Sequence, residues 1–259
     1  MSRLIDKFHQ ASKAAPPPMG FRTSRPAAEA PKIILIASLE AGAAGSPDEY
    51  LEGADAVLIR FGKIAPTAKA VQKIASTLPD IPWGIQTGGE ESKKAAGEGA
   101  DFMVFTADSQ VTDTPGDEKT GKILQLESSM DDGLLRAVND LPVDAMLVDD
   151  IFQGKEPPVW HEMMIAQHLA NMLSKPLIIP ASAGISEKEL KIIWDAGVDG
   201  IIVEADAASK DGFKDLRGLI DKLPARSGRK HGKINAVLPR AAAETPALAP
   251  PDEEEEEEE

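Results

Sequence analysis

Residues 175–206 read KPLIIPASAGISEKELKIIWDAGVDGIIVEAD, and this stretch decides the fold. LIIPAS is an apolar run of strand length, and GIIVE is a second one. Between them, Ser186 is followed three positions later by Glu189, which is the spacing of a capping box and predicts a helix start. Two apolar strands joined through one helix indicate a βαβ unit with parallel strands.

The same unit recurs along most of the chain. Strand-like runs occupy residues 33–38, 56–61, 82–87, 102–106, 123–128, 145–150, 177–182 and 200–205. Helical patterns fill most of the gaps, at residues 66–78, 90–97, 130–140, 158–174, 186–196 and 209–223. Near-continuous apolar strands need helices outside them and a filled interior. The pattern therefore predicts an α/β fold of the (βα)8 TIM-barrel type.

An internal repeat supports closure of this barrel. The strands that begin at residues 56, 102, 145 and 200 each follow a small-residue turn and an aspartate, which read EGAD, EGAD, LPVD and AGVD. A glycine in such a turn ends the preceding helix and lets the chain enter the next strand. A two-strand unit repeated four times is expected of a closed eight-stranded barrel, whereas an open sheet has no reason to show it.

Two arms flank the barrel pattern. Residues 1–30 combine a short helical pattern, LIDKFHQASKA, with a proline-rich stretch, and we expect this arm to pack on the barrel or to be partly disordered. The alternative is a docking arm or a weak membrane-surface anchor. Residues 31–224 form the predicted barrel. Residues 225–259 hold a basic segment and an acidic low-complexity tail, which we expect to be disordered.

Composition narrows the range of partners. The net charge of the 259 residues is −15, and Asp252 with the glutamates 253–259 accounts for eight of the negative charges. An acidic body argues against a nucleic-acid partner. Cysteine is absent, so disulfides and thiolate chemistry are not expected. We find no signal-peptide pattern and no apolar run long enough to span a bilayer, and we expect a cytoplasmic location.

The candidate site follows from the architecture, because active sites of such barrels lie at the carboxyl ends of the strands. These ends carry Ser38, Glu40, Arg60, Gln86, Thr87, Thr106, Glu127, Asp149, Asp150, Ser182, Glu204 and Asp206. We expect Glu127 and Asp149 to act as general acid and base, and Arg60 to hold an anionic group. Gln86 and Glu204 are further candidates for ligand contact. If a metal binds, Mg²⁺ on Asp149, Asp150 and Glu204 is the expected case, since hard cations take oxygen ligands.

The residue types at these strand ends also argue against two kinds of chemistry. No lysine ends a predicted strand, so a lysine imine could form only through a mobile loop. No histidine ends a strand either, which disfavours a zinc site; His161 and His168 are expected on an outer helix.

The stretch at 175–206 resembles the last quarter of phosphate-binding TIM barrels, the aldolase-type superfamily. It is similar to the closing segments of thiazole synthase, thiamine-phosphate synthase and flavin-dependent barrels. There, a glycine-rich loop after strand seven and a glycine turn after strand eight present backbone N–H groups to a phosphate. Ala183, Gly184 and Ile185 match the first element, whereas Glu204-Ala205-Asp206-Ala207 departs from the second. The resemblance implies phosphate or flavin mononucleotide (FMN) binding at Ser182, Ala183, Gly184 and Ser186.

Three functions remain open at this point. The first is a lyase, synthase or isomerase that acts on a small anionic, phosphorylated metabolite. The second is a barrel that has lost catalysis and serves as a binding or scaffold protein. The third is an FMN-dependent oxidoreductase. The Met-rich segment 158–174 is read as a packed outer helix, with a homo-oligomer face as the alternative.

Overall fold

The computed structural model describes residues 2–12, 32–41, 51–61, 68–78, 80–86, 99–114, 116, 119–152, 158–205 and 212–224. All of these lie in one compact unit, residues 1–229. The predicted acidic tail and the proline-rich stretch fall outside the described residues. The proposed domain boundaries at residues 30 and 224 therefore stay predictions.

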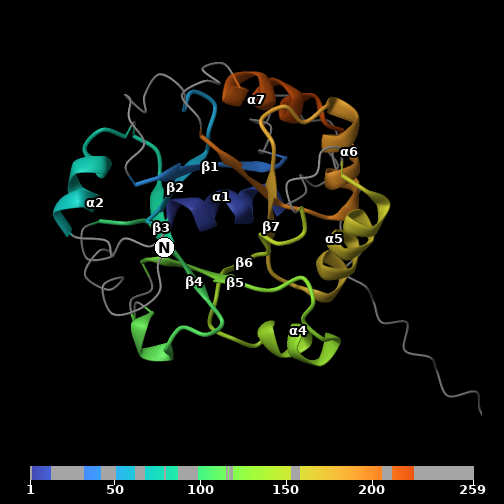
Figure 1. The fold of residues 1–259 in the computed structure, drawn as a ribbon, viewed down its shortest axis with the longest axis horizontal. Coiled ribbons are helices and arrows are strands. Elements are labelled where there is room, and N and C mark those ends of the chain that lie inside the picture. Colours follow the sequence, from blue (N-terminus) through green and yellow to red (C-terminus); the bar gives the residue numbers. More distant parts are fainter. Residues whose placement is uncertain are drawn as a thin grey trace, which may run out of the picture. The chain divides into compact units, whose positions relative to one another are not determined.

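Eight parallel strands form a closed barrel in sequence order (Figure 1). They are β1 (Ile34–Glu40), β2 (Ala56–Arg60), β3 (Trp83–Gln86), β4 (Phe102–Thr106), β5 (Gly121–Gln125), β6 (Ala145–Leu147), β7 (Leu177–Ala181) and β8 (Gly200–Glu204). Closure rests on the pairing of the first strand with the last, in which Ile34 is opposite Gly200 and Ser38 is opposite Glu204. The predicted TIM barrel is confirmed.

Helices surround the barrel where the sequence predicts them. They are α2 (Ala68–Ala75), α4 (Asp132–Val138), α5 (Trp160–Met172), α6 (Glu187–Ala196) and α7 (Gly212–Lys222), with a short 3₁₀ turn η2 (Val111–Asp113). The helix expected at 90–97 lies outside the described residues. Within the part of the chain that is described, no helix is long and apolar enough to cross a membrane.

The fourfold aspartate repeat has a structural cause that the sequence did not reveal. In each repeat the aspartate N–H donates to a backbone carbonyl at the start of the preceding strand, at 2.7–2.9 Å. The four bonds run from Asp55 to Leu35, from Asp101 to Trp83, from Asp144 to Lys122 and from Asp199 to Leu177. In three repeats the carboxylate also accepts the N–H of that same residue, at 3.0, 2.8 and 3.0 Å. The aspartate thus clamps two strands at the amino end of the barrel.

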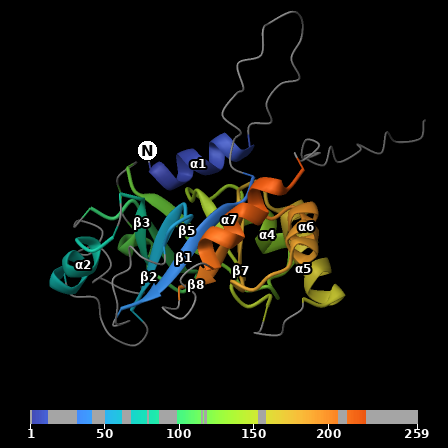
Figure 2. The same ribbon diagram turned by 90° about the horizontal axis from the view of Figure 1, so that it is seen from above.

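Asp101 departs from this pattern because a helix takes its carboxylate. Helix α1 (Arg3–Ser12) lies across the amino end of the barrel (Figures 1 and 2). Asp101 accepts the N–H groups of Arg3 and Leu4 at 2.7 and 2.9 Å and the Ser2 hydroxyl at 2.6 Å. A carboxylate is favourable here because the first N–H groups of a helix have no partner within the helix.

Helix α1 closes this end of the barrel. Its buried residues Leu4, Ile5 and Phe8 belong to the same apolar cluster as the inward-facing strand residues. Two strand glycines make room for them: a Cβ at Gly121 would lie 2.8 Å from Ile5 Cγ1, and one at Gly200 would lie 3.0 Å from the Phe8 ring. The expected packing of the amino-terminal helix is confirmed, and the carboxyl ends of the strands form the other mouth.

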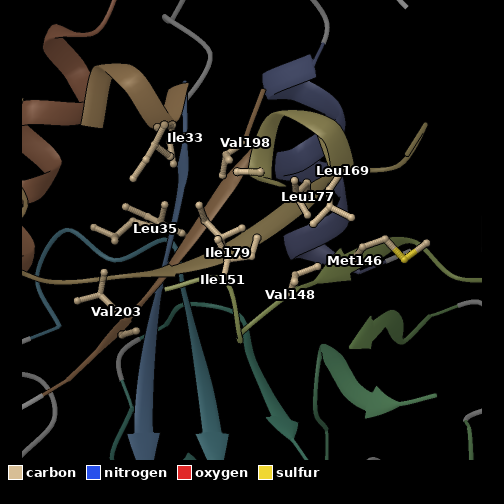
Figure 3. Close-up of a cluster of buried hydrophobic side chains, with 14 of the residues drawn as sticks. Ile33, Leu35, Met146, Val148, Ile151, Leu169, Leu177, Ile179, Val198 and Val203 are labelled. Carbon is tan, nitrogen blue, oxygen red and sulfur yellow. The ribbon is translucent and has the colours of Figure 1, made fainter. Parts of the chain in front are cut away.

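A second, larger cluster lies between the barrel wall and the helices. It joins outward-facing strand residues such as Leu35, Ile179 and Val203 to helix residues such as Leu169 (Figure 3). Strands covered by side chains on both faces explain the near-continuous apolar runs in the sequence.

Two strands end three residues earlier than predicted. Strand β5 spans 121–125 rather than 123–128, and β6 spans 145–147 rather than 145–150. The residue that ends β5 is therefore Gln125, and Glu127 lies in the loop after it.

Candidate functional site at the barrel mouth

Alternation along the strands decides which polar residues face the barrel interior. Leu58, Ile123, Leu147 and Ile202 belong to the inner cluster. Two positions further along the chain come Arg60, Gln125, Asp149 and Glu204, which share their face. The inner layers are thus apolar near helix α1 and become polar at the mouth.

A cavity of about 480 Å³ opens at this mouth. Its polar lining comes from Arg60, Asp149, Ser182, Glu189 and Glu204. Its apolar lining comes from Phe152, Pro158, Pro180, Ala181, Ala183, Ile185, Ile193 and Ile202. A mainly apolar cavity with a few polar groups on opposite sides has the composition of a small-molecule site.

A chain of hydrogen bonds crosses the mouth beside the cavity. Gln86 Nε2 donates to Gln125 Oε1 at 2.7 Å, and Gln125 Nε2 donates to Asp149 Oδ2 at 2.8 Å. These residues come from β3, β5 and the segment after β6. The chain holds one carboxylate oxygen of Asp149 in place.

Two buried polar atoms at the far end of this chain lack a partner. Among the described residues, neither Arg60 Nε nor Gln86 Oε1 makes a hydrogen bond, although both atoms are buried. Arg60 and Gln86 are opposite each other in the β2–β3 pairing. Buried polar atoms are nearly always paired, so an open donor at the cavity, with an open acceptor on the neighbouring strand, is a sign of a missing ligand.

The loop after β7 uses most of its own donors. The N–H of Gly184 donates to Ser182 Oγ at 3.1 Å, and that of Ile185 donates to the Ser182 carbonyl at 3.3 Å. The predicted capping box is confirmed: Ser186 N–H donates to Glu189 Oε2 at 2.8 Å, and Glu189 N–H donates to Ser186 Oγ at 3.4 Å. The hydrogen bond from the Ser186 backbone lowers the pKa of Glu189. A carboxylate thus occupies the place at the helix start where the resemblance implies a phosphate.

The structure separates the predicted acid and base. Asp149 lines the cavity, whereas Glu127 is exposed and contacts Ser129 Oγ at 3.4 Å. Gln125, rather than the predicted Glu127, is the inward-facing polar residue at the end of β5. Its signal was present in the sequence, because Gln125 is the polar residue inside the apolar run ILQL.

The predicted oxygen ligands for a metal also diverge. Asp149 faces the mouth, while both carboxylate oxygens of Asp150 accept the Ser128 N–H at 3.0 Å and one accepts the Ser128 hydroxyl at 2.9 Å. Adjacent residues of an extended chain point to opposite sides. Among the residues that the structure describes, no group of three potential protein ligands could hold a metal. Asp206 and Thr87 lie outside the described residues.

The two histidines of helix α5 lie where the sequence predicts them. His161 and His168 are exposed on the outer layer. His168 Nε2 is 2.9 Å from Asp132 Oδ1, an exposed pair between α5 and α4.

Comparison with known proteins identifies the fold and no family. The chain matches no protein-family model and no curated protein sequence. Among solved structures, it is similar to thiamine phosphate pyrophosphorylase from Pyrococcus furiosus, with 16% identity, a TM-score of 0.56, and coverage of 74% of this chain and 96% of that one. It is also similar to orotidine 5′-phosphate decarboxylase from Pyrococcus horikoshii OT3, with 12% identity, a TM-score of 0.56, and coverage of 73% and 100%.

A third similar structure is a variant of the tryptophan synthase alpha-subunit from Pyrococcus furiosus. It has 14% identity, a TM-score of 0.54, and coverage of 73% of this chain and 96% of that chain. These three structures share the barrel fold of this chain, so the predicted resemblance is confirmed at the level of the fold. At such identities the fold alone is shared, and a function has to be argued from the site.

Proposed function

We propose that this protein is an enzyme of the lyase, synthase or isomerase kind that binds a small anionic metabolite in the barrel mouth. The observation that carries the proposal is the buried, unpartnered Nε of Arg60 at the cavity. A buried donor without a partner costs about 1–3 kcal/mol, and an anionic ligand would remove that cost. A guanidinium also matches the geometry of a carboxylate or phosphate.

Asp149 is the proposed acid–base residue. Its Oδ2 accepts from Gln125, which leaves Oδ1 as the oxygen that can exchange a proton with a ligand. Arg60 and Asp149 both line the cavity; Arg60 ends β2, and Asp149 follows β6 on the opposite side of the barrel. A ligand anchored at Arg60 would therefore extend toward Asp149, the arrangement that general acid–base catalysis needs. Glu127 stays a sequence-based candidate without this support.

The groups that line the cavity bear on whether the anion carries a phosphate. The names of two structural neighbours contain a phosphate compound, which favours it. Against it, Glu189 and Glu204 are carboxylates at the β7–β8 side of the cavity, and Glu189 already binds the start of α6. Arg60 is thus the better-supported anchor for the anion.

A thermal-shift screen tests the proposal. The panel consists of inorganic phosphate, phosphorylated three-carbon acids, unphosphorylated hydroxy and keto acids, and Mg²⁺. We expect an anion to raise the melting temperature of the wild type, because a ligand that binds only the folded state stabilises it. Arg60→Met should abolish this shift and Arg60→Lys should weaken it. Arg136→Met, an exposed arginine on α4, is the matched control and should keep it.

Turnover separates the two candidate acid–base residues. With a substrate from the screen, Asp149→Asn should lower kcat by about 10²–10⁴-fold, the usual contribution of such a group. Glu127→Gln should have little effect. A wild-type shift that persists in Arg60→Met would place the ligand elsewhere and remove the basis of the proposal.

A binding or scaffold protein without catalysis is the second candidate. It is favoured by the balance of charges at the cavity, where three carboxylates (Asp149, Glu189 and Glu204) accompany Arg60. Binding without turnover of any ligand from the screen would support it. The FMN alternative is tested by the visible absorbance spectrum of the purified protein.

A further inference from the structure

The open donor and the open acceptor at the mouth lie side by side. Arg60 and Gln86 are direct partners in the parallel pairing of β2 and β3. Neighbouring strands are about 4.8 Å apart, and both side chains project from the same inward face. Arg60 Nε can only donate, whereas Gln86 Oε1 can only accept. The mouth thus presents an adjacent donor–acceptor pair.

The carboxylate of Asp149 determines which atom of Gln86 is open. The carboxylate oxygen Oδ2 of Asp149 accepts from Gln125 Nε2, so Gln125 turns its NH₂ group toward Asp149. The Gln125 oxygen then faces Gln86, which must turn its own NH₂ group toward it. The oxygen of Gln86 is left facing away from the chain. A glutamine on its own could present either atom, but this one has its direction set through two hydrogen bonds.

We propose that the anion bound at the mouth is a hydroxy acid, whose hydroxyl group sits next to its acidic group and donates to Gln86 Oε1. This inference rests on the proposed function, because it needs an anion at Arg60. The acidic group accepts from Arg60 while the neighbouring hydroxyl satisfies the acceptor beside it. A keto acid of the same size would set a carbonyl oxygen against Oε1 and leave both acceptors unpaired.

The three residues of the chain have different roles in this selection. Gln86 is the specificity residue that reads the hydroxyl group. Neither glutamine lines the cavity itself, but Gln86 is the direct strand partner of Arg60, which does. Gln125 is a positioning residue, since its side chain is bound on both sides and fixes the direction of Gln86. Asp149 sets the direction of the whole chain in addition to its proposed acid–base role. Discrimination by a hydrogen bond of this kind is stronger than discrimination by size, because the wrong ligand leaves buried polar atoms unpaired.

The test compares two matched pairs of probes by calorimetric titration. The pairs are lactate with pyruvate, and 3-phosphoglycerate with 3-phosphohydroxypyruvate. Within each pair only the hydroxyl and keto groups differ. We expect the wild type to bind the hydroxy member of at least one pair about tenfold tighter or more, a ratio that corresponds to one well-formed hydrogen bond.

Three variants then probe the chain. Gln125→Met conserves volume and unlinks Gln86 from Asp149, so the ratio should fall toward one while the keto acid binds as before. Gln86→Met and Asp149→Asn should also reduce the ratio. Asp195→Asn makes the same carboxylate-to-amide change in an exposed pair with Lys191 on α6, and it should keep the wild-type ratio. Thermal melting checks that each variant is folded.

The failures of the two proposals can be told apart. Equal binding of hydroxy and keto acids by the wild type, with binding still lost in Arg60→Met, would overturn the hydroxy-acid inference and leave the proposed function standing. A ratio that survives in folded Gln125→Met would overturn the role of the chain. If neither pair binds, the hydroxy-acid inference is overturned, and the proposed function is judged on the wider anion panel.

Discussion

A single aspartate shows how one side chain can be reassigned within a repeat. Asp55, Asp144 and Asp199 each bind the backbone N–H at the start of the neighbouring strand. Asp101 occupies the same position and instead caps helix α1. All four repeats therefore share the same backbone hydrogen bond, whereas the carboxylate accepts either from a strand N–H or from the first N–H groups of α1.

Gly121 is the residue at which the packing of α1 can be tested. Gly121→Ala should lower the free energy of unfolding by about 1–3 kcal/mol, the usual cost of an extra methyl group in a packed core. The new Cβ would meet Ile5 Cγ1 at 2.8 Å and Ser2 Oγ at 2.9 Å. Urea denaturation measures the change.

Gly218 on α7 provides the matched control. A Cβ there has no atom within 4 Å, so Gly218→Ala should instead stabilise the protein by about 0.5–1 kcal/mol through helix propensity. Equal effects of the two substitutions would show that α1 does not pack tightly against β5.

At the scale of elements, helix α6 joins a structural role with a candidate functional one. Its capping box was predictable, because a serine and a glutamate three residues apart precede an apolar helical pattern. The same box occupies the donors that the resemblance assigns to a phosphate. The local sequence predicts a capping box at the start of α6, whereas the family resemblance implies a phosphate there. The hydrogen bonds of the structure are those of the capping box.

The charge of Glu189 gives this cap a pH dependence. The pKa of Glu189 is lowered in the folded state from its ordinary value of 4.5, chiefly by the Ser186 backbone N–H. The ionised group therefore adds stability above pH 4.5, and this contribution is lost as the pH falls through the lowered folded value. Glu189→Gln keeps a neutral cap, so its melting temperature should lie below that of the wild type at neutral pH.

The difference between the two proteins should shrink and vanish as the solution is acidified through this range. Lys188→Gln, one position earlier on the exposed side of the helix, is the control. A wild-type advantage that stayed constant down to strongly acidic pH would show that the charge of Glu189 is not its cause.

The ends of the strands were harder to predict than their existence. The apolar pattern continues past the last residues of β5 and β6, since Leu126 and Val148 are buried and their N–H groups still donate to Leu147 and Ile178 of the neighbouring strands. The apolar pattern therefore predicts a strand over residues 123–128, with Glu127 near its end, whereas β5 ends at Gln125. The Gln86–Gln125–Asp149 chain was out of reach for a further reason: it joins residues 39 and 24 positions apart that only the closed barrel brings together.

For the whole molecule, the order of the strands and the closure of the barrel followed from the repeat, because four similar units fill a ring. Arg60 and Asp149 were predictable as strand-end residues for the same reason. The sequence could not predict which of their polar atoms make hydrogen bonds. Whether Arg60 Nε has a partner depends on every side chain and backbone group that surrounds it in the folded barrel.

The acidic tail yields a prediction at this scale, although it lies outside the described residues. Deleting residues 241–259 should leave the melting temperature nearly unchanged, because AAAETPALAPPDEEEEEEE has too few apolar residues to gain stability by packing. Thermal melting of the full chain and the truncated chain in the same buffer compares them. A fall of several degrees on truncation would mean that the tail contributes to the fold.

Helix α1 finally imposes an order of events on folding. It precedes every strand in the chain, yet the surface that receives it is completed only when β8 brings Gly200 beneath Phe8. Until then Leu4, Ile5 and Phe8 have no complete site to enter, and they stay exposed on any barrel that lacks its last strand. Contacts between segments so distant in sequence form late, since the intervening chain must first be ordered. We therefore expect the docked helix to mark a finished barrel, and an unfinished barrel to expose three apolar side chains.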